Sequence, residues 1–224
     1  MSVEKVFWTD PYLTKLSTRI TSAANGTITL ERTIAFAFSG GQASDTGTIN
    51  GRSILKAEKL DKEIFYTLEG PQDMVPGDEA LIEIDWERRY RIMKLHFAAE
   101  IILELVNRHF GNPAKIGANI ADTKARLDFI WDKNISDIFP FLQSEAEKLI
   151  ESELPISSAF SDTADEKRYW EIKGFGRVSC GGTHIRNTGE IGRIRLKRGN
   201  IGKGKERIEI YLAEDLQGCE EGKP

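Results

Sequence analysis

The chain has 224 residues, of which 40% are hydrophobic, so it can form the core of one large domain or of two modest ones. No run approaches the ~18 consecutive apolar residues that a membrane span needs, and residues 1–10 lack the basic and apolar segments of a signal peptide. The only two cysteines, Cys180 and Cys219, are a poor basis for a disulfide framework. We therefore expect a cytoplasmic protein with no membrane partner.

The first part of the chain, residues 3–85, has the pattern of short strands and turns. Apolar and polar residues alternate in 26–30 and again in 80–84, and turn-forming residues lie between such segments. This pattern predicts a small β-rich N-terminal domain over residues 1–85.

Helical spacing begins at Trp86 and continues to Phe110, where Gly111 is expected to end the helix. The apolar positions of this helix form one stripe of Met93, Phe97, Ile101 and Leu105 and a neighbouring stripe of Ile92, Leu95, Ala99 and Ile102. A second helix is predicted from about Asp137 to Glu153.

Residues 170–212 return to strand and turn character. Two strands near the end alternate apolar and charged residues, over 193–197 and 208–212, and the basic loop 199–205 joins them. Residues 86–215 are therefore predicted to be an α+β domain in which an antiparallel sheet packs on helices, so the fold class is α+β. We expect the tail, residues 216–224, to be disordered.

Basic residues cluster strongly between Arg186 and Arg207. This stretch contains eight basic and two acidic residues and so carries a formal charge of +6 in a chain whose net charge is −4. Such a stretch can bind RNA phosphates, or it can be a solvated charged face. The candidate RNA-binding residues are Arg186, Arg193, Arg195, Lys197, Arg198, Lys203, Lys205 and Arg207.

Two pairs of residues have the spacing of metal ligands. His96 and Glu100 are four apart on the predicted helix and so leave the same face, although such a pair is also common as a simple polar contact. Cys180 and His184 are four apart with two glycines between them. Thiolate, imidazole and carboxylate are all zinc ligands, so the four residues together predict one Zn²⁺ site.

The sequence motifs of other hydrolase classes are incomplete or absent. Residues 199–205 have the GxxxxGK spacing of a phosphate-binding loop, but Glu206 stands where Ser or Thr would bind magnesium, and a strand follows in place of a helix. The sequence contains neither a GxSxG nucleophile elbow nor an HExxH zinc motif. Nucleotide hydrolysis is therefore excluded.

Four motifs follow one another along the chain: the glycine-rich run 39–47, the run 85–90 before the helix, the CGGTH motif 180–184 and the closing segment 202–210. In this order they resemble the motifs of the editing domain of alanyl-tRNA synthetases and its freestanding AlaX relatives. The resemblance covers approximately Phe7 to Leu212. It implies a β-barrel-like N-terminal domain beside an α+β editing domain, and hydrolysis of serine or glycine wrongly attached to tRNA(Ala) at a zinc site.

The resemblance also suggests individual roles. Gly40, Gly41, Gln42 and Asp45 are candidate substrate-binding residues, and the basic stretch would hold the aminoacyl-tRNA. Glu100, Thr183 and Gln42 are candidate catalytic residues, of which Gln42 and Thr183 could recognise a serine hydroxyl.

The sequence departs from the family pattern in four places. Glu100 replaces the second histidine of the family's HxxxH motif, Ser39 replaces a glycine, Ala43 replaces a proline, and Ala114 stands where a glutamine is common. Glu100 is thus either a fourth ligand that weakens the Lewis acidity of the metal or a general base beside a three-ligand site. A non-catalytic tRNA-binding module, or a deacylase for another aminoacyl ester, is also compatible with the sequence.

Overall fold

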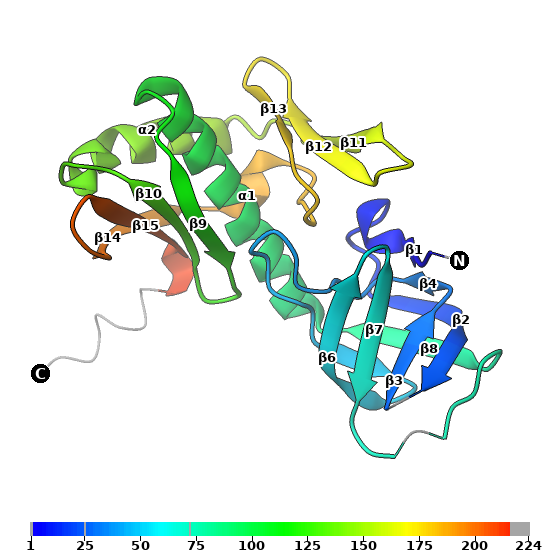
Figure 1. Ribbon diagram of the computed structural model, residues 1–224. Helices are drawn as coiled ribbons and strands as arrows, with labels where there is room; N and C mark the ends of the chain where they lie inside the picture. The colour runs from blue at the N-terminus through cyan, green and yellow to red at the C-terminus, as the bar shows by residue number, and fades with distance from the viewer. Residues whose placement is uncertain (1, 25, 72, 216–224) are drawn as a thin grey trace, which may run out of the picture. The chain divides into compact units, whose positions relative to one another are not determined.

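The computed structural model describes residues 2–24, 26–71 and 73–215, so the expected disordered tail lies outside the described residues. The described chain divides into two compact units, one ending at Tyr90 and the other beginning at Arg91 (Figure 1). The predicted domain boundary between residues 85 and 86 stays a prediction. No helix in the described part of the chain combines the length and the apolar character needed to cross a membrane.

The N-terminal unit is built on a closed barrel, as the resemblance implied. Six strands form it, in the spatial order β2, β3, β7, β6, β5 and β8 (Figure 1). Their bounds are Lys15–Ala24 (β2), Thr27–Leu30 (β3), Gly47–Ile49 (β5), Arg52–Leu60 (β6), Glu63–Leu68 (β7) and Glu79–Ile84 (β8). A short parallel pair, β1 (Glu4–Lys5) with β4 (Arg32–Thr33), lies outside the barrel order.

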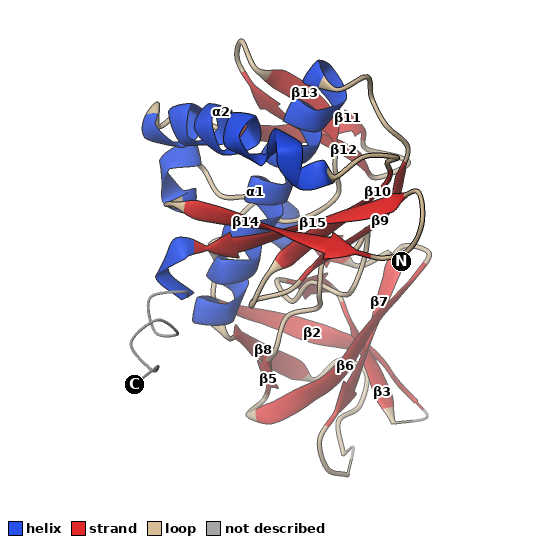
Figure 2. Ribbon diagram, turned by 90° about the vertical axis from the view of Figure 1, so that its left-hand side faces the viewer, coloured by secondary structure: helices blue, strands red, loops and turns tan. Residues whose placement is uncertain are grey.

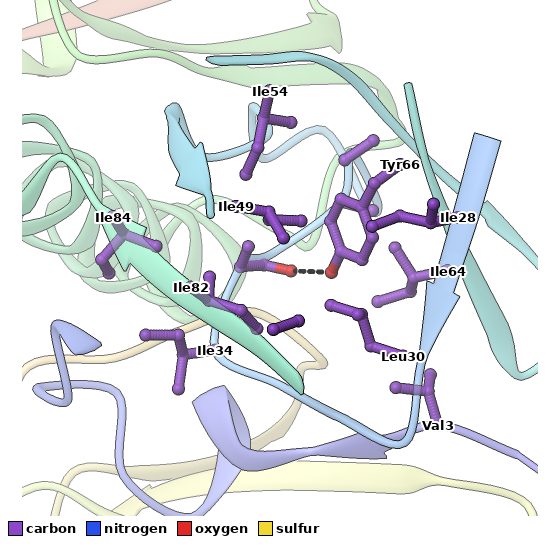
Figure 3. Packing of buried hydrophobic residues seen from close by; sticks show 14 of the residues in the cluster. Val3, Ile28, Leu30, Ile34, Ile49, Ile54, Ile64, Tyr66, Ile82 and Ile84 are labelled. Carbon is purple, nitrogen blue, oxygen red and sulfur yellow. Dashed lines mark hydrogen bonds between the residues drawn. The ribbon is translucent and has the colours of Figure 1, made fainter. Parts of the chain in front are cut away.

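Apolar side chains fill the barrel, because alternate residues of each strand point inward. Ile28, Ile64 and Ile82 are fully buried or nearly so (Figure 3). Tyr66 is also fully buried, and its hydroxyl lies 2.7 Å from Thr33 Oγ1 and donates to the carbonyl of Ala35 at 2.8 Å. The interior is thus a packed core whose one phenol is satisfied by hydrogen bonds.

Helix α1, Trp86–His109, agrees with the prediction to within one residue. Asp85 caps its start, since the Asp85 carboxylate accepts a hydrogen bond from the amide of Arg88 at 3.1 Å. Gly111 follows the end with a φ of +79°, the left-handed geometry that favours glycine after a helix. All eight apolar positions predicted for the two stripes are buried.

The C-terminal unit combines two helices with two antiparallel sheets, which confirms the α+β class (Figure 2). One sheet has the order β14, β15, β10, β9 and the other β11, β12, β13. The bounds are Lys115–Ile120 (β9), Ala125–Ile130 (β10), Ser157–Asp162 (β11), Lys167–Ile172 (β12), Gly176–Ser179 (β13), Ile194–Asn200 (β14) and Lys205–Leu212 (β15). Short 3₁₀ turns span Val6–Trp8, Ile135–Ile138, Thr188–Ile191 and Ala213–Asp215.

The second predicted helix is α2, Phe139–Glu151, two residues shorter at each end than expected. A 3₁₀ turn capped by the Asn134 side chain precedes it, and Pro140 occupies its first turn. Strands β9 and β11 were not predicted individually, because most of their residues are exposed or half-buried and so lack a regular apolar alternation.

Candidate metal centre

Three of the four predicted metal ligands meet in the C-terminal unit. His96 comes from the middle of α1, and Cys180 and His184 come from the loop that follows β13. The Sγ of Cys180 lies 3.4 Å from Nε2 of His96 and 3.2 Å from Nε2 of His184. The three donor atoms all lie within 4.8 Å of one another, so the group could hold a metal ion.

The donor set has the chemistry of a zinc site. Zinc bonds of about 2.3 Å to sulfur and about 2.0 Å to nitrogen, at the tetrahedral angle, separate the two donors by about 3.5 Å. The two distances from Cys180 Sγ, 3.4 and 3.2 Å, are close to that value. Both histidines also direct the same ring nitrogen, Nε2, toward the thiol.

Ser158 orients His184. The Oγ of this β11 residue lies 3.0 Å from Nδ1 of His184, the ring nitrogen that does not approach Cys180. A hydrogen bond at Nδ1 fixes which nitrogen is free to ligate, and such outer contacts tune metal affinity. The edge-on contact of the His184 ring with Phe97, at 5.6 Å between centroids, further limits its rotation.

Arg168 holds the CGGTH loop at two points. Its carbonyl accepts a hydrogen bond from the amide of Cys180 at 2.9 Å, and its Nη1 donates to the carbonyl of Gly182 at 3.2 Å. The guanidinium is buried, and burial lowers the pKa of Arg168 to about 10. Sequence patterns pointed to neither Ser158 nor Arg168, because both contacts depend on how the β11–β12–β13 sheet meets the loop.

Glu100 lies beside the three donors but is not one of the group. Its Oε1 is 3.3 Å from Nε2 of His96, and its Oε2 accepts a hydrogen bond from Nε1 of Trp170 at 3.0 Å. The predicted ligation by Glu100 stays a prediction. The contact with Trp170 was missed, since nothing in the sequence links that strand residue to the helix.

The buried side chains of the cluster have strongly shifted pKa values. Burial lowers the pKa of His96, but its contacts with Cys180 and Glu100 outweigh burial and raise the pKa to about 10. Burial raises the pKa of Glu100, and the hydrogen bond from His96 reverses this and lowers it to about 2. Burial, together with the charge of His96, lowers the pKa of His184 to about 3. Glu100 thus carries a negative charge beside a protonated His96 and a neutral His184, and a divalent ion bound here would compete with the proton on His96.

The glycine-rich run forms a tight turn in the N-terminal unit. Ser39 and Gln42 exchange two backbone hydrogen bonds, of 2.9 and 3.3 Å, and Gly40 and Gly41 between them have φ of +60° and +91°. A two-residue hairpin turn of type I′ needs positive φ at both central positions, so the turn alone explains both glycines. The predicted contacts of Gly40, Gly41 and Gln42 with substrate stay predictions.

Asp45 has a structural partner at the end of the same run. Its carboxylate is bonded to Nε of Arg89 at 2.8 Å, to Nη2 of Arg89, and to the amide of Phe36 at 2.6 Å. Both side chains of the ion pair are almost completely buried. Asp45 therefore ties the loop to the start of α1, and its predicted contact with substrate is untested.

Two predicted catalytic side chains, Gln42 and Thr183, are buried. Their residues are 1% and 0% exposed, respectively. Gln42 belongs to the N-terminal unit and Thr183 to the C-terminal unit. Their predicted contacts with a serine hydroxyl stay predictions.

The sheet register separates the predicted RNA-binding residues. Arg195 lies opposite Tyr211 and Lys197 opposite Glu209, on the face that also carries Arg207. Arg198 alternates to the other face, where it forms an ion pair with the buried Glu206. Arg186 and Arg193 are exposed but lie outside the strands, and Lys203 lies in the connecting turn. Lys205 is the first residue of β15 and shares the face of Arg207.

Neighbouring strand β10 and Lys124, the residue before it, add two cations that the sequence analysis did not single out. Arg126 lies opposite Glu209, and Lys124 forms an ion pair with Glu209 at 2.6 Å. The ammonium groups of Lys124 and Lys197 lie 5.7 and 5.0 Å from the centre of the Tyr211 ring. The three adjacent strands thus present one basic face with an aromatic ring in it.

Comparison with known proteins agrees with this architecture. Residues 171–209, which include the CGGTH loop and β14, match the family described as the threonyl and alanyl tRNA synthetase second additional domain. The segment that carries Cys180 and His184 is thus similar to a domain of the threonyl and alanyl tRNA synthetases.

Full-length similarity narrows the class to one family. The alanyl-tRNA editing protein AlaX-M of Pyrococcus horikoshii is 31% identical over 212 residues, covering 93% of this chain and 97% of that protein. AlaX-M of Methanosarcina barkeri is 28% identical, with 94% of this chain and 99% of that protein covered. The chain belongs to the AlaX-M family of alanyl-tRNA editing proteins.

The same region occurs within larger proteins. The alanine–tRNA ligase of Sulfurisphaera tokodaii is 29% identical over 239 residues, which cover 95% of this chain but 26% of the ligase. The chain thus spans about a quarter of that ligase.

Proposed function

We propose that this protein is a trans-editing deacylase that hydrolyses the ester of serine or glycine wrongly attached to tRNA(Ala), in the cytoplasm and with one zinc ion. The observation that carries the proposal is the convergence of His96, Cys180 and His184 in a member of the AlaX-M family. Ester hydrolysis needs an activated water and stabilisation of the oxyanion that forms on the carbonyl.

His96, Cys180 and His184 would hold the ion, which when bound supplies a water of lowered pKa and a Lewis acid for the ester carbonyl. Ser158 keeps Nε2 of His184 directed at the site through its contact with Nδ1. Arg168 maintains the loop that carries Cys180 and His184.

We assign Glu100 the role of proton acceptor for the attacking water. Two observations support this role over ligation. The carboxylate lies outside the group of three mutually close donors, and one of its oxygens is held by Trp170. The other oxygen lies 3.3 Å from Nε2 of His96 and so borders the group, where it could accept a proton from an attacking water. In the same proposal Thr183, which lies in the loop that carries Cys180 and His184, recognises the serine hydroxyl.

The RNA backbone is proposed to lie on the basic face of β14, β15 and β10. Six cations occupy this face against two carboxylates, Asp128 and Glu209, so its net charge is positive. The cations are Lys124, Arg126, Arg195, Lys197, Lys205 and Arg207. Arg198 is left out, because its guanidinium pairs with Glu206 on the opposite face.

Salt dependence tests the basic face. Replacing both Arg195 and Lys197 by Gln should weaken tRNA binding and make the slope of log affinity against log salt about 2 units shallower, one for each phosphate that these cations no longer neutralise. Lys148→Gln, which removes an exposed α2 cation paired with Glu145, serves as the control and should leave the slope unchanged. Equal slopes for all three proteins would remove this face from the proposal.

Deacylation assays test the activity itself. Tritiated Ser-tRNA(Ala) and Gly-tRNA(Ala) should lose their amino acid in the presence of the wild-type protein, while correctly charged Ala-tRNA(Ala) should persist. Cys180→Ala should reduce hydrolysis to the background rate. If the wild-type protein binds tRNA tightly but cleaves no ester, it is a non-catalytic tRNA-binding module. If it cleaves a different charged tRNA, it is a deacylase for another aminoacyl ester.

A further inference from the structure

A pocket of about 540 Å³ lies in the N-terminal unit, between the glycine-rich run and strand β6. Ser44 and Thr46 of the run form one wall, and residues 54–59 of β6 form another. Phe38 and Arg88 also line it. Its size is in the range of pockets that bind small ligands or a few groups of a larger one.

The β6 wall has an open strand edge. β6 pairs with β5 only at Arg52 and Ser53, whereas residues 54–60 pair with β7 alone. Within the described residues no strand pairs with the other side of this outer half. The pocket therefore lies along backbone that can offer hydrogen-bond donors and acceptors to a ligand.

Two large apolar side chains of the lining are unusually exposed. Phe38 is 58% exposed and Leu55 is 64% exposed, although the barrel core beneath them is fully packed. An accessible aromatic ring at the margin of a pocket can stack a nucleic-acid base, a contact that tolerates any base. Leu55 supplies further apolar surface beside it.

The charged side chains that line the pocket favour the binding of an anion. Three cations, Lys56, Lys59 and Arg88, line the pocket together with two acidic residues, Asp45 and Glu58. The charge of Asp45 is neutralised by its buried ion pair with Arg89. The remaining groups carry a net positive charge, as a phosphate-bearing ligand requires.

We propose that this pocket binds the unpaired 3′ nucleotides of the RNA substrate, with a base stacked on Phe38 and phosphates near Lys56, Lys59 and Arg88. The identity of the RNA rests on the proposed function, whereas the preference for a base with phosphates rests on the lining. Arg88 links the pocket to the glycine-rich run by donating from Nη1 to the carbonyl of Ser44 at 2.5 Å.

Binding of two RNA hairpins tests the pocket without any ester cleavage. The probes are 5′-fluorescein acceptor-stem hairpins of tRNA(Ala), one with its unpaired 3′ extension and one blunt, and fluorescence polarisation gives their affinities for the full chain. The wild-type protein should bind the extended hairpin about tenfold more tightly, the effect of one stacked base. Phe38→Ala should bind both hairpins equally, and Phe38→Trp, which keeps an aromatic face, should retain the preference.

Leu60→Ala is the matched control, because Leu60 is a β6 side chain, also 64% exposed, that does not line the pocket. It should keep the wild-type preference. A Phe38→Ala protein that still prefers the extended hairpin, or a Leu60→Ala protein that loses the preference to the same degree, would overturn the proposal. If the wild-type protein hydrolyses Ser-tRNA(Ala) but shows no preference for the extended hairpin, the proposed pocket is wrong and the proposed enzymatic function stands. If it prefers the extended hairpin but hydrolyses no ester, the proposed enzymatic function is wrong and the pocket stands.

Discussion

Nε2 of His96 lies 3.4 Å from Sγ of Cys180, although 84 residues separate them in the chain. One residue belongs to a buried helix and the other to a loop after a small sheet, so their proximity depends on the tertiary fold of the C-terminal unit. A thiol and two imidazoles gathered in this way can bind a divalent metal ion, and the residues around them can then be tested one at a time.

Replacing Glu100 with Gln separates the two roles considered for this residue. If Glu100 accepts a proton, the variant should retain metal and lose about 10²- to 10⁴-fold in the deacylation rate, because the amide cannot act as a base. Metal content by elemental analysis and single-turnover hydrolysis of Ser-tRNA(Ala) measure the two effects. Loss of the metal from this variant would instead make Glu100 a ligand.

Replacing Ser158 with Ala should weaken metal binding about 10- to 100-fold, because Nδ1 of His184 then lacks the hydroxyl that orients the ring. Competition with a chromophoric chelator measures the affinity. Ser157→Ala is the control, since the neighbouring Ser157 hydroxyl donates to the carbonyl of Glu171 and does not contact the site. Equal affinities for the two variants would show that Ser158 does not orient the ligand.

Replacing Asp45 with Asn tests whether this residue serves the fold or the substrate. The Asp45–Arg89 pair is almost completely buried, and breaking such a pair by removing one partner costs about 3–5 kcal/mol. We expect urea unfolding to report a decrease of this size in the free energy of unfolding. Unchanged stability together with a raised KM for charged tRNA would show that the residue contacts substrate, as the family resemblance implied.

Glu206 should contribute to stability in a pH-dependent way. The hydrogen bond from Arg198 lowers the pKa of Glu206 below its ordinary value of 4.5 in the folded state. A carboxyl with a depressed folded pKa stabilises the protein above its unfolded pKa, and this contribution is lost as the pH falls through the folded pKa. Glu206→Gln should therefore lower the Tm at pH 7, and the difference from wild type should shrink below about pH 4. A difference that stays constant down to pH 3 would contradict this account.

Local sequence patterns predicted the three residues that meet in the candidate metal centre. The spacing of His96 and of Cys180 with His184 is local, and the helix and loop that hold them follow from short-range apolar periodicity and glycine. The contacts that orient these residues were missed. Ser158 lies on the mostly exposed strand β11, and Trp170 gives no local sign that it meets Glu100 across 70 residues.

The basic stretch illustrates the same limit at the surface. Eight cations adjacent in sequence predicted one surface, but strand alternation turns Arg198 to the opposite face. The β10–β15 pairing brings in Arg126 and sets Asp128 beside Arg207, 79 residues away. The pairing register of distant strands determines which of these side chains are adjacent. This register cannot be read from the sequence of either strand alone.

The most direct test of the metal centre is the zinc content of the purified chain. After dialysis against metal-free buffer, elemental analysis of the wild-type protein should find about one zinc per chain, and Cys180→Ala, which lacks the thiolate that both histidines approach, should retain far less. A wild-type chain that carries no divalent metal even after incubation with zinc, or a Cys180→Ala chain that holds as much zinc as the wild type, would contradict the assignment of His96, Cys180 and His184 as the ligands.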